Sequence, residues 1–174
     1  VRREVVRLIT PGTIDIDEAT SANDNLYLSS VYITNKTSSI AYADITTGEF
    51  TALEVRDDHD NEQLISELSR IAPKEVIYFD ETSSDFIDRY SKAAPETYIN
   101  HIDESYFKYS SCEDILKSQF EVTSLIPLDI QDKIEVTIAS GALLLYLMET
   151  EKHASPQIKH LTLKETGLSM ILDR

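Results

Sequence analysis

Glycine, cysteine and long apolar runs are scarce in this chain of 174 residues, and each scarcity excludes a class of protein. Four scattered glycines cannot form the glycine-rich cradle of a P-loop or a dinucleotide-binding turn. The single cysteine, Cys112, excludes an internal disulfide framework and a thiolate zinc site. The longest apolar run, Ala142 to Met148, is far shorter than the roughly 20 residues that cross a bilayer. We therefore expect no transmembrane helix.

Basic residues are also few. The chain has 16 Lys and Arg against 31 Asp and Glu, which gives a formal net charge of −15. A nucleic-acid backbone would meet repulsion from such a surface instead of favourable counterion release. We therefore do not expect the chain by itself to bind nucleic acid, and we interpret the acidic residues as solvated helix faces and loops.

The histidines and the cysteine show no pattern typical of a metal centre or a nucleophile. No two histidines have a metal-ligand spacing such as i, i+4. Cys112 is followed by Glu113 and Asp114, whose charges would raise the thiol pKa and disfavour a thiolate. We therefore predict structural or surface roles for these residues, namely His59, His101, His153, His160 and Cys112.

The first part of the chain reads as strands. Residues 4–9 form a short apolar run that Pro11-Gly12-Thr13 closes with a turn signal, and the acidic residues 14–25 read as a loop. Runs rich in β-branched and aromatic residues follow, joined by short turns that require antiparallel pairing. These predicted meander strands are residues 26–34, 39–46 and 49–56.

After residue 56 the apolar spacing becomes helical and then alternates between helix and strand. Asp60 with Gln63, and Ser111 with Asp114, resemble capping boxes at the starts of two helices. The predicted order is a helix ending at residues 72–73, a buried strand at 76–79, a helix starting at Ser83 or Ser84, a strand at 97–102 and a short third helix through Phe120. This order predicts an α/β fold with a mixed sheet, antiparallel on one side, parallel on the other and covered by helices.

Composition shifts after Phe120. Residues 125–128 read as a linker, and residues 129–153 as a long helix whose portion from Ile138 to Met148 is apolar almost all round. Further apolar runs at 158–163 and 170–172 flank Gly167. We therefore predict a first domain over residues 1–125 and the beginning of a second, mainly helical one over 126–174. The start at Val1, without an initiator Met, suggests a piece of a longer protein.

A meander followed by alternating helices and strands is also the order of ribonuclease-H-like folds, in which carboxylates hold two magnesium ions. Asp44 on a strand, Glu62 or Glu67 on the first helix, and Asp80 after the buried strand are the candidates here. A metal-dependent nuclease is therefore one alternative, although 31 acidic residues offer such sets by chance and a nuclease needs basic surface.

Three aromatic residues lie just past the last predicted strand of the first domain. Tyr106, Phe107 and Tyr109 either complete the core or form an exposed patch for a partner. Large aromatic side chains often anchor interfaces, so they are candidate partner-binding residues.

Several segments, taken in order, form a specific combination. They are VVRLITPGT at residues 5–13, AYADITTGEF at 41–50, PKE at 73–75, GALLLYL at 141–147 and PQI at 156–158. Together they resemble the MutS family of DNA mismatch repair proteins across essentially the whole chain. The resemblance implies a ribonuclease-H-like connector domain over residues 1–125 and the start of the core or lever domain over 126–174.

The same resemblance implies a role without catalysis. In the family the connector links mismatch recognition to the ATPase core and offers a surface to the partner MutL. The resemblance also implies that mismatched DNA, ATP with magnesium, and a second MutS subunit are bound by parts outside this sequence, in a cytoplasmic bacterial protein. No catalytic, cofactor or metal residue is expected in this sequence. The apolar run from Ile138 to Met148 is expected to be covered by the missing core domain, or by a second copy of the fragment. A generic acidic scaffold domain is a third alternative.

Overall fold

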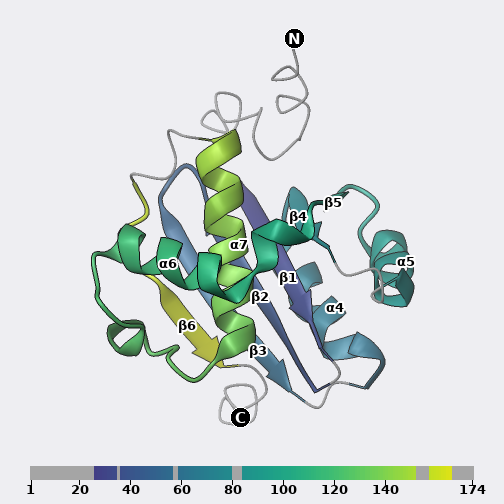
Figure 1. The fold of residues 1–174 in the computed structure, drawn as a ribbon. Coiled ribbons are helices and arrows are strands. Elements are labelled where there is room, and N and C mark those ends of the chain that lie inside the picture. Colours follow the sequence, from purple (N-terminus) through teal and green to yellow (C-terminus); the bar gives the residue numbers. More distant parts are fainter. Residues whose placement is uncertain (1–25, 35, 57–58, 80–83, 152–156, 166–174) are drawn as a thin grey trace, which may run out of the picture.

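The computed structural model describes residues 26–34, 36–56, 59–79, 84–151 and 157–165 (Figure 1). Its strands are β1 (Tyr27–Ile33), β2 (Thr37–Asp44), β3 (Glu49–Arg56), β4 (Glu75–Tyr78), β5 (Tyr98–His101) and β6 (Thr162–Glu165). Its α-helices are α4 (Glu62–Ile71), α5 (Ser84–Ala93), α6 (Tyr109–Phe120) and α7 (Ile134–Thr150), with single 3₁₀ turns η1 (His59–Asn61), η3 (Glu104–Phe107) and η4 (Ile126–Leu128).

The strands form one mixed sheet of six, in the order β5-β4-β1-β2-β3-β6. β1, β2 and β3 pair antiparallel, while β4 is parallel to β1 and β5 is parallel to β4. Short turns force the antiparallel pairs, and the crossovers through α4 and α5 allow the parallel ones. The predicted ribonuclease-H-like mixed sheet is confirmed. β6, which lies parallel beside β3 at the far edge, was not predicted as a strand.

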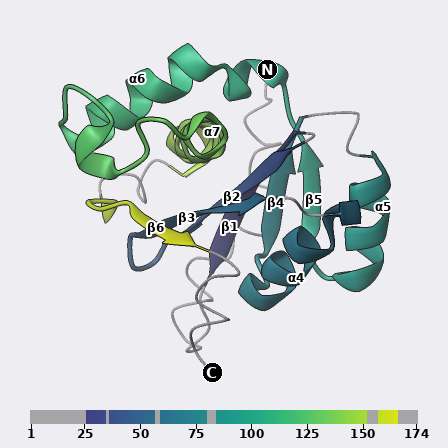
Figure 2. The same cartoon turned by 90° about the horizontal axis from the view of Figure 1, so that it is seen from below.

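Alternating residues on strands β1 to β4 supply two separate cores. On β2, Ala41 and Ala43 belong to the core under α7, whereas Ile40 and Tyr42 belong to the core under α4 and α5. In the same way Val76 and Ile77 of β4 face opposite cores, as expected for a strand buried on both sides. Figure 2 shows the result as three layers, with α6 and α7 on one face of the sheet and α4 and α5 on the other.

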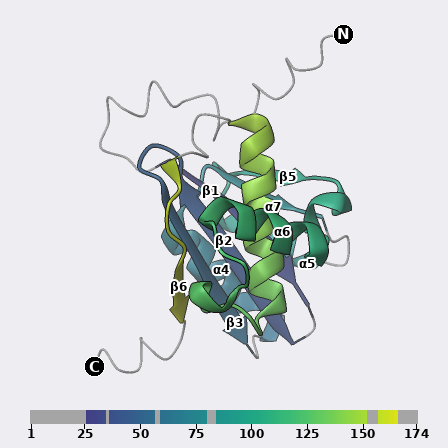
Figure 3. The ribbon, with the colours of Figure 1, turned by 60° about the vertical axis from the view of Figure 1, so that its left-hand side comes forward.

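Helix α7 lies along the sheet and under α6 (Figures 1 and 3). Nearly every residue from Val136 to Leu147 is buried, and only Leu145 in that stretch is partly exposed. The expectation that Ile138 to Met148 is covered by a missing core domain, or by a second copy of the fragment, is therefore wrong for this chain, because the sheet and α6 already cover it. Met148, the last residue of this run, is 38% exposed. In the described part of the chain, no helix has both the length and the apolar character needed to span a bilayer.

This packing bears on the predicted division of the chain. α7 begins after residue 126, yet it shares a core with β1, β2 and β3. A domain boundary between residues 125 and 126 stays a prediction, and the packing of α7 and the pairing of β6 favour grouping both elements with the sheet.

Both predicted capping boxes are wrong. The N-cap of α4 is Asn61 in a left-handed conformation and without a side-chain hydrogen bond, so Asp60 lies in the preceding turn instead. The N-cap of α6 is Lys108, which puts Ser111 and Asp114 inside the helix. α6 starts earlier than the predicted cap at Ser111 because Phe107 and Cys112 are buried. Burial of these two side chains in the core, and not a polar cap, positions the start of the helix.

Several predictions concern residues outside the described ones. They are the strand at 4–9 with its turn at 11–13, the loop at 14–25, Ser83 as a cap, the last residues of the helix predicted over 129–153, and the apolar run at 170–172 beyond Gly167.

The burial of β4 predicts a large effect of truncation at its centre. Ile77 is 1% exposed in the core under α7, so Ile77→Ala should lower the free energy of unfolding by about 2 to 5 kcal/mol, through lost transfer energy and a cavity. Ile126→Ala is a matched control, because Ile126 is 61% exposed. Urea denaturation measures both variants, and equal midpoints for them would contradict the central position of β4.

The contact between α6 and α7 predicts that Gly141 accepts no larger side chain. A Cβ at this position would lie 2.2 Å from Cys112 Cβ and 2.5 Å from Cys112 Cα. Alanine favours a helix over glycine by about 1 kcal/mol. Forcing two backbones apart costs about 1 to 3 kcal/mol or more, so Gly141→Ala should lower the melting temperature.

Ser140→Ala is the control for the Gly141 variant, because the Ser140 hydroxyl is buried and has no hydrogen-bond partner among the described residues. Removing it should leave the melting temperature unchanged or raise it. A Gly141→Ala variant as stable as the Ser140→Ala variant would show that α6 and α7 are not in close contact.

Candidate functional site

The three candidate aromatic residues divide between core and surface. Phe107 is 5% exposed, and its ring lies 4.9 Å from Phe79 and 6.4 Å from Tyr32, centroid to centroid. Tyr106 and Tyr109 are half-buried, one at the end of η3 and the other at the start of α6. Phe107 therefore anchors this segment from within, and only the two tyrosines are accessible to a partner.

Tyr106 is held against the C-terminal part of α7. Its hydroxyl donates to the Glu149 carboxylate, and its ring lies edge-on to Tyr146 at 6.3 Å. Burial, and then the hydrogen bond and charge of Glu149, raise the pKa of Tyr106 to about 12, so the phenol stays a neutral donor. Asp103 caps η3 by accepting from the Ser105 amide at 2.8 Å, and this hydrogen bond lowers the Asp103 pKa.

A buried polar network lies close behind this surface. The hydroxyl of Tyr146 on α7 donates to Glu75 Oε2 at 2.6 Å, and Asn100 Nδ2 donates to the same oxygen at 3.0 Å. Glu75 is fully buried at the start of β4, and Asn100 lies on β5. The network therefore joins two strands to α7. Sequence reasoning missed it, and its only signals were one tyrosine in an apolar helix and one glutamate opening an apolar strand.

The candidate metal-binding carboxylates have other contacts. Asp44 is buried where β2 ends, and its Oδ1 accepts from the Thr46 amide at 2.9 Å and the Thr46 hydroxyl at 2.6 Å. Glu67 pairs with Arg70 at 2.8 Å, while Glu62 is exposed. Among the described residues, no three His, Cys, Asp or Glu side chains are grouped so as to hold a metal ion. Asp80 lies outside the described residues.

Cys112 is deeply buried between α6 and α7. Its thiol lies 3.3 Å from the Tyr106 carbonyl oxygen and 3.4 Å from that of Ile138. Burial raises its pKa to about 12, so the thiolate required for nucleophilic chemistry is strongly disfavoured. The cause is desolvation, whereas the sequence suggested the neighbouring acidic residues.

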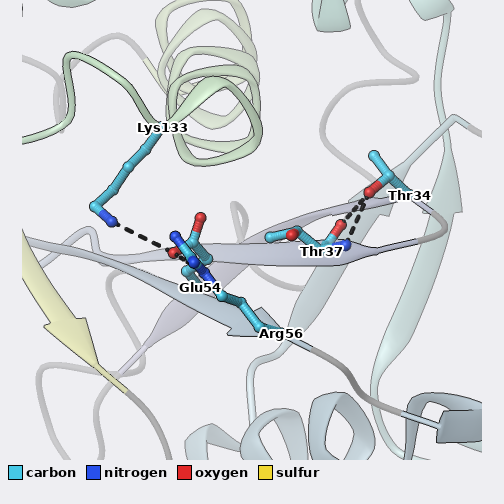
Figure 4. Close-up of polar contacts among 5 residues, drawn as sticks. All are labelled: Thr34, Thr37, Glu54, Arg56 and Lys133. Atoms are coloured by element: carbon cyan, nitrogen blue, oxygen red, sulfur yellow. Dashed lines mark hydrogen bonds and ion pairs between the residues drawn. The ribbon is translucent and has the colours of Figure 1, made fainter.

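One charged cluster fixes the opposite end of α7. Figure 4 shows Glu54 of β3 between Arg56 and Lys133, the N-cap residue of α7. Glu54 Oε1 lies 3.0 Å from Arg56 Nε and 3.4 Å from Lys133 Nζ. Nearby, Thr34 and Thr37 close the β1–β2 hairpin, where the Thr37 amide donates to Thr34 Oγ1 at 3.0 Å. These contacts hold elements in place and present no reactive group.

Comparison with known proteins gives one consistent result. Residues 26–162 match the family model described as MutS domain II. The chain is 33% identical over 175 residues to the DNA mismatch repair protein MutS of Alkaliphilus metalliredigens and 34% identical over 174 residues to that of Ruminiclostridium cellulolyticum, in each case over 99% of this chain and 20% of the relative. It is also 32% identical over 163 residues to MutS of Orientia tsutsugamushi, covering 91% of this chain and 17% of that protein.

The chain thus spans about a fifth of the length of the curated relatives it matches. The matched range runs from β1 to the first residue of β6, so it includes α7 together with the sheet. The motifs AYADITTGEF and GALLLYL, which carried the resemblance, lie on the β2–β3 hairpin and on α7. The sheet, its covering helices and the sequence matches agree, and the chain belongs to the MutS domain II family.

Proposed function

We propose that this chain is the connector module of a larger DNA mismatch repair protein, without catalysis of its own, and that it offers a docking surface to MutL. The family membership and the name shared by its relatives support the repair role. The observation that carries the docking role is an aromatic surface, formed by the half-buried Tyr106 and Tyr109, in a segment that the buried Phe107 anchors.

The anchoring favours a binding role because an interface residue that is already fixed loses little freedom on binding. Phe107 packs in the core, and the Tyr106 hydroxyl is held by Glu149. Tyr146 contacts the ring of Tyr106 and, through its hydroxyl, reaches Glu75 on β4. A partner that binds this surface would therefore act on α7 and on the sheet together, because the contacts of Tyr106 reach both. A module that links other parts of a protein requires such a connection.

The remaining functions of the whole protein are proposed from the resemblance alone. We infer that mismatched DNA, ATP with magnesium and a second subunit are bound by parts outside this chain, in the cytoplasm. The net charge of −15 agrees with assigning DNA binding to other parts. The alternative of a metal-dependent nuclease using Asp44 has weaker support, because Asp44 is buried and already binds Thr46 in the turn.

Replacing Tyr109, one of the two accessible tyrosines, tests the docking role. In the full-length parent protein, Tyr109→Ala should weaken MutL recruitment by about tenfold or more, as the loss of an anchoring aromatic does. Mismatch binding and ATPase activity should stay unchanged, because we assign both to parts outside this chain. Tyr98→Ala is the matched control, since Tyr98 is 38% exposed on β5.

Phe107→Ser provides the contrast. Phe107 is 5% exposed, so this variant should lose stability and all three activities together. Normal MutL recruitment by the Tyr109→Ala variant would contradict the docking role, as would an equal loss in the Tyr98→Ala variant.

A further inference from the structure

A polar hollow of about 470 Å³ lies on the side of the sheet that α4 covers. Its walls come from four strands, from α4 and from the segment that joins α4 to β4. The polar residues that line it are Tyr27, Tyr42, Glu49, Arg70, Lys74 and Lys164. The volume lies within the range of roughly 300 to 1,000 Å³ that is usual for small-ligand sites. Phe107, which anchors the tyrosine surface proposed for MutL, packs in the other core.

The charge of this hollow is opposite to that of the chain. Three of the 16 basic residues line it, in a chain of net charge −15, and Glu49 is the one carboxylate among its described lining residues. Glu49 accepts a hydrogen bond from the Tyr27 hydroxyl at 3.0 Å. Within the described part of the chain, neither Lys74 nor Lys164 forms an ion pair, and both are exposed.

Donor groups remain available inside the hollow. Tyr42 is 3% exposed, and its hydroxyl lies 3.4 Å from Lys164 Nζ. Because this hydroxyl accepts from the ammonium group, it keeps its own proton to donate. Arg70 uses Nε and Nη2 to bind Glu67 Oε1, at 3.2 and 2.8 Å. Its guanidinium also interacts with the Tyr42 hydroxyl, and both partners raise the pKa of Arg70, Glu67 more than Tyr42. Among the described residues, Arg70 Nη1 forms no ion pair. Two ammonium groups, the guanidinium of Arg70 and the phenol of Tyr42 therefore surround the same space.

We propose that this hollow binds a phosphate group, either free or carried on a nucleotide, between Lys74, Lys164 and the guanidinium of Arg70. A phosphate carries close to two negative charges and several acceptor oxygens. A ligand with a phosphate group therefore fits three cations and a phenol better than a ligand with a single carboxylate does. Glu49, the one carboxylate among the described lining residues, would repel a phosphate, so the group lies at the three cations instead. The site is independent of the connector role, because it uses none of the residues assigned to MutL docking.

The direct test is a titration of the 174-residue chain with inorganic phosphate, followed by amide NMR at constant ionic strength with chloride as the balancing ion. We expect saturable shifts of the amides of Tyr42, Ala72 and Lys74. A parallel titration with adenosine monophosphate identifies the source of the phosphate: at least about tenfold tighter binding than inorganic phosphate indicates a nucleotide, and equal binding indicates free phosphate.

The double variant Lys74→Gln/Lys164→Gln should weaken phosphate binding at least about tenfold. The control is Lys36→Gln/Lys92→Gln, which removes the same charge from exposed lysines that do not line the hollow. Melting temperatures confirm that all variants are folded. Shifts that fail to saturate, or equal weakening of phosphate binding in both double variants, would overturn the proposal. A third titration uses an oligoglutamate peptide, which offers carboxylates instead of phosphate. Binding of this peptide without binding of phosphate would also overturn the proposal.

Discussion

The packing of α7 against the sheet is the contact on which the rest of this structure depends. β2 offers two small residues, Ala41 and Ala43, to the core that α7 fills. On its other side α7 meets α6, where Gly141 leaves room for Cys112. A helix that is apolar almost all round needs cover on both sides, and the sheet with α6 provides it. Polar contacts then fix its ends, Lys133 with Glu54 near its start and Tyr146 with Glu75 towards its end.

This constraint relates the proposed docking surface to the fold. The segment with Tyr106 and Tyr109 contacts the sheet side through the ring of Phe107, which packs on Tyr32 and Phe79, and it is held to α7 by the hydrogen bond from Tyr106 to Glu149. A partner at that surface would therefore contact the helix that crosses the sheet. The hollow that we propose to bind phosphate lies on the other face of the sheet, where α4 and the segment that follows it contact the strands. The two proposed sites thus rest on separate cores of one sheet.

Much of the fold could be predicted because its signals are local. Alternating residues with short turns determine β1, β2 and β3, and a compact apolar run determines β4. β6 could not be predicted, because its partner β3 lies about a hundred residues earlier and its sequence TLKE carries little apolar pattern. The capping box predicted at Ser111 failed because the core residues Phe107 and Cys112 set the start of α6. Neither the Glu75 network nor the hollow was predictable, since each gathers residues from elements distant in sequence.

Native-state hydrogen exchange tests most directly whether α7 and the sheet form one cooperative unit. The amides to compare are those of Ala139 to Leu144 in α7 and Ile40 to Ala43 in β2, all of them buried. We predict that both groups exchange with the same free energy of opening, equal to that of global unfolding. Exchange of the α7 amides at a clearly lower free energy, while those of β2 stay protected, would show that α7 opens on its own and would contradict this account.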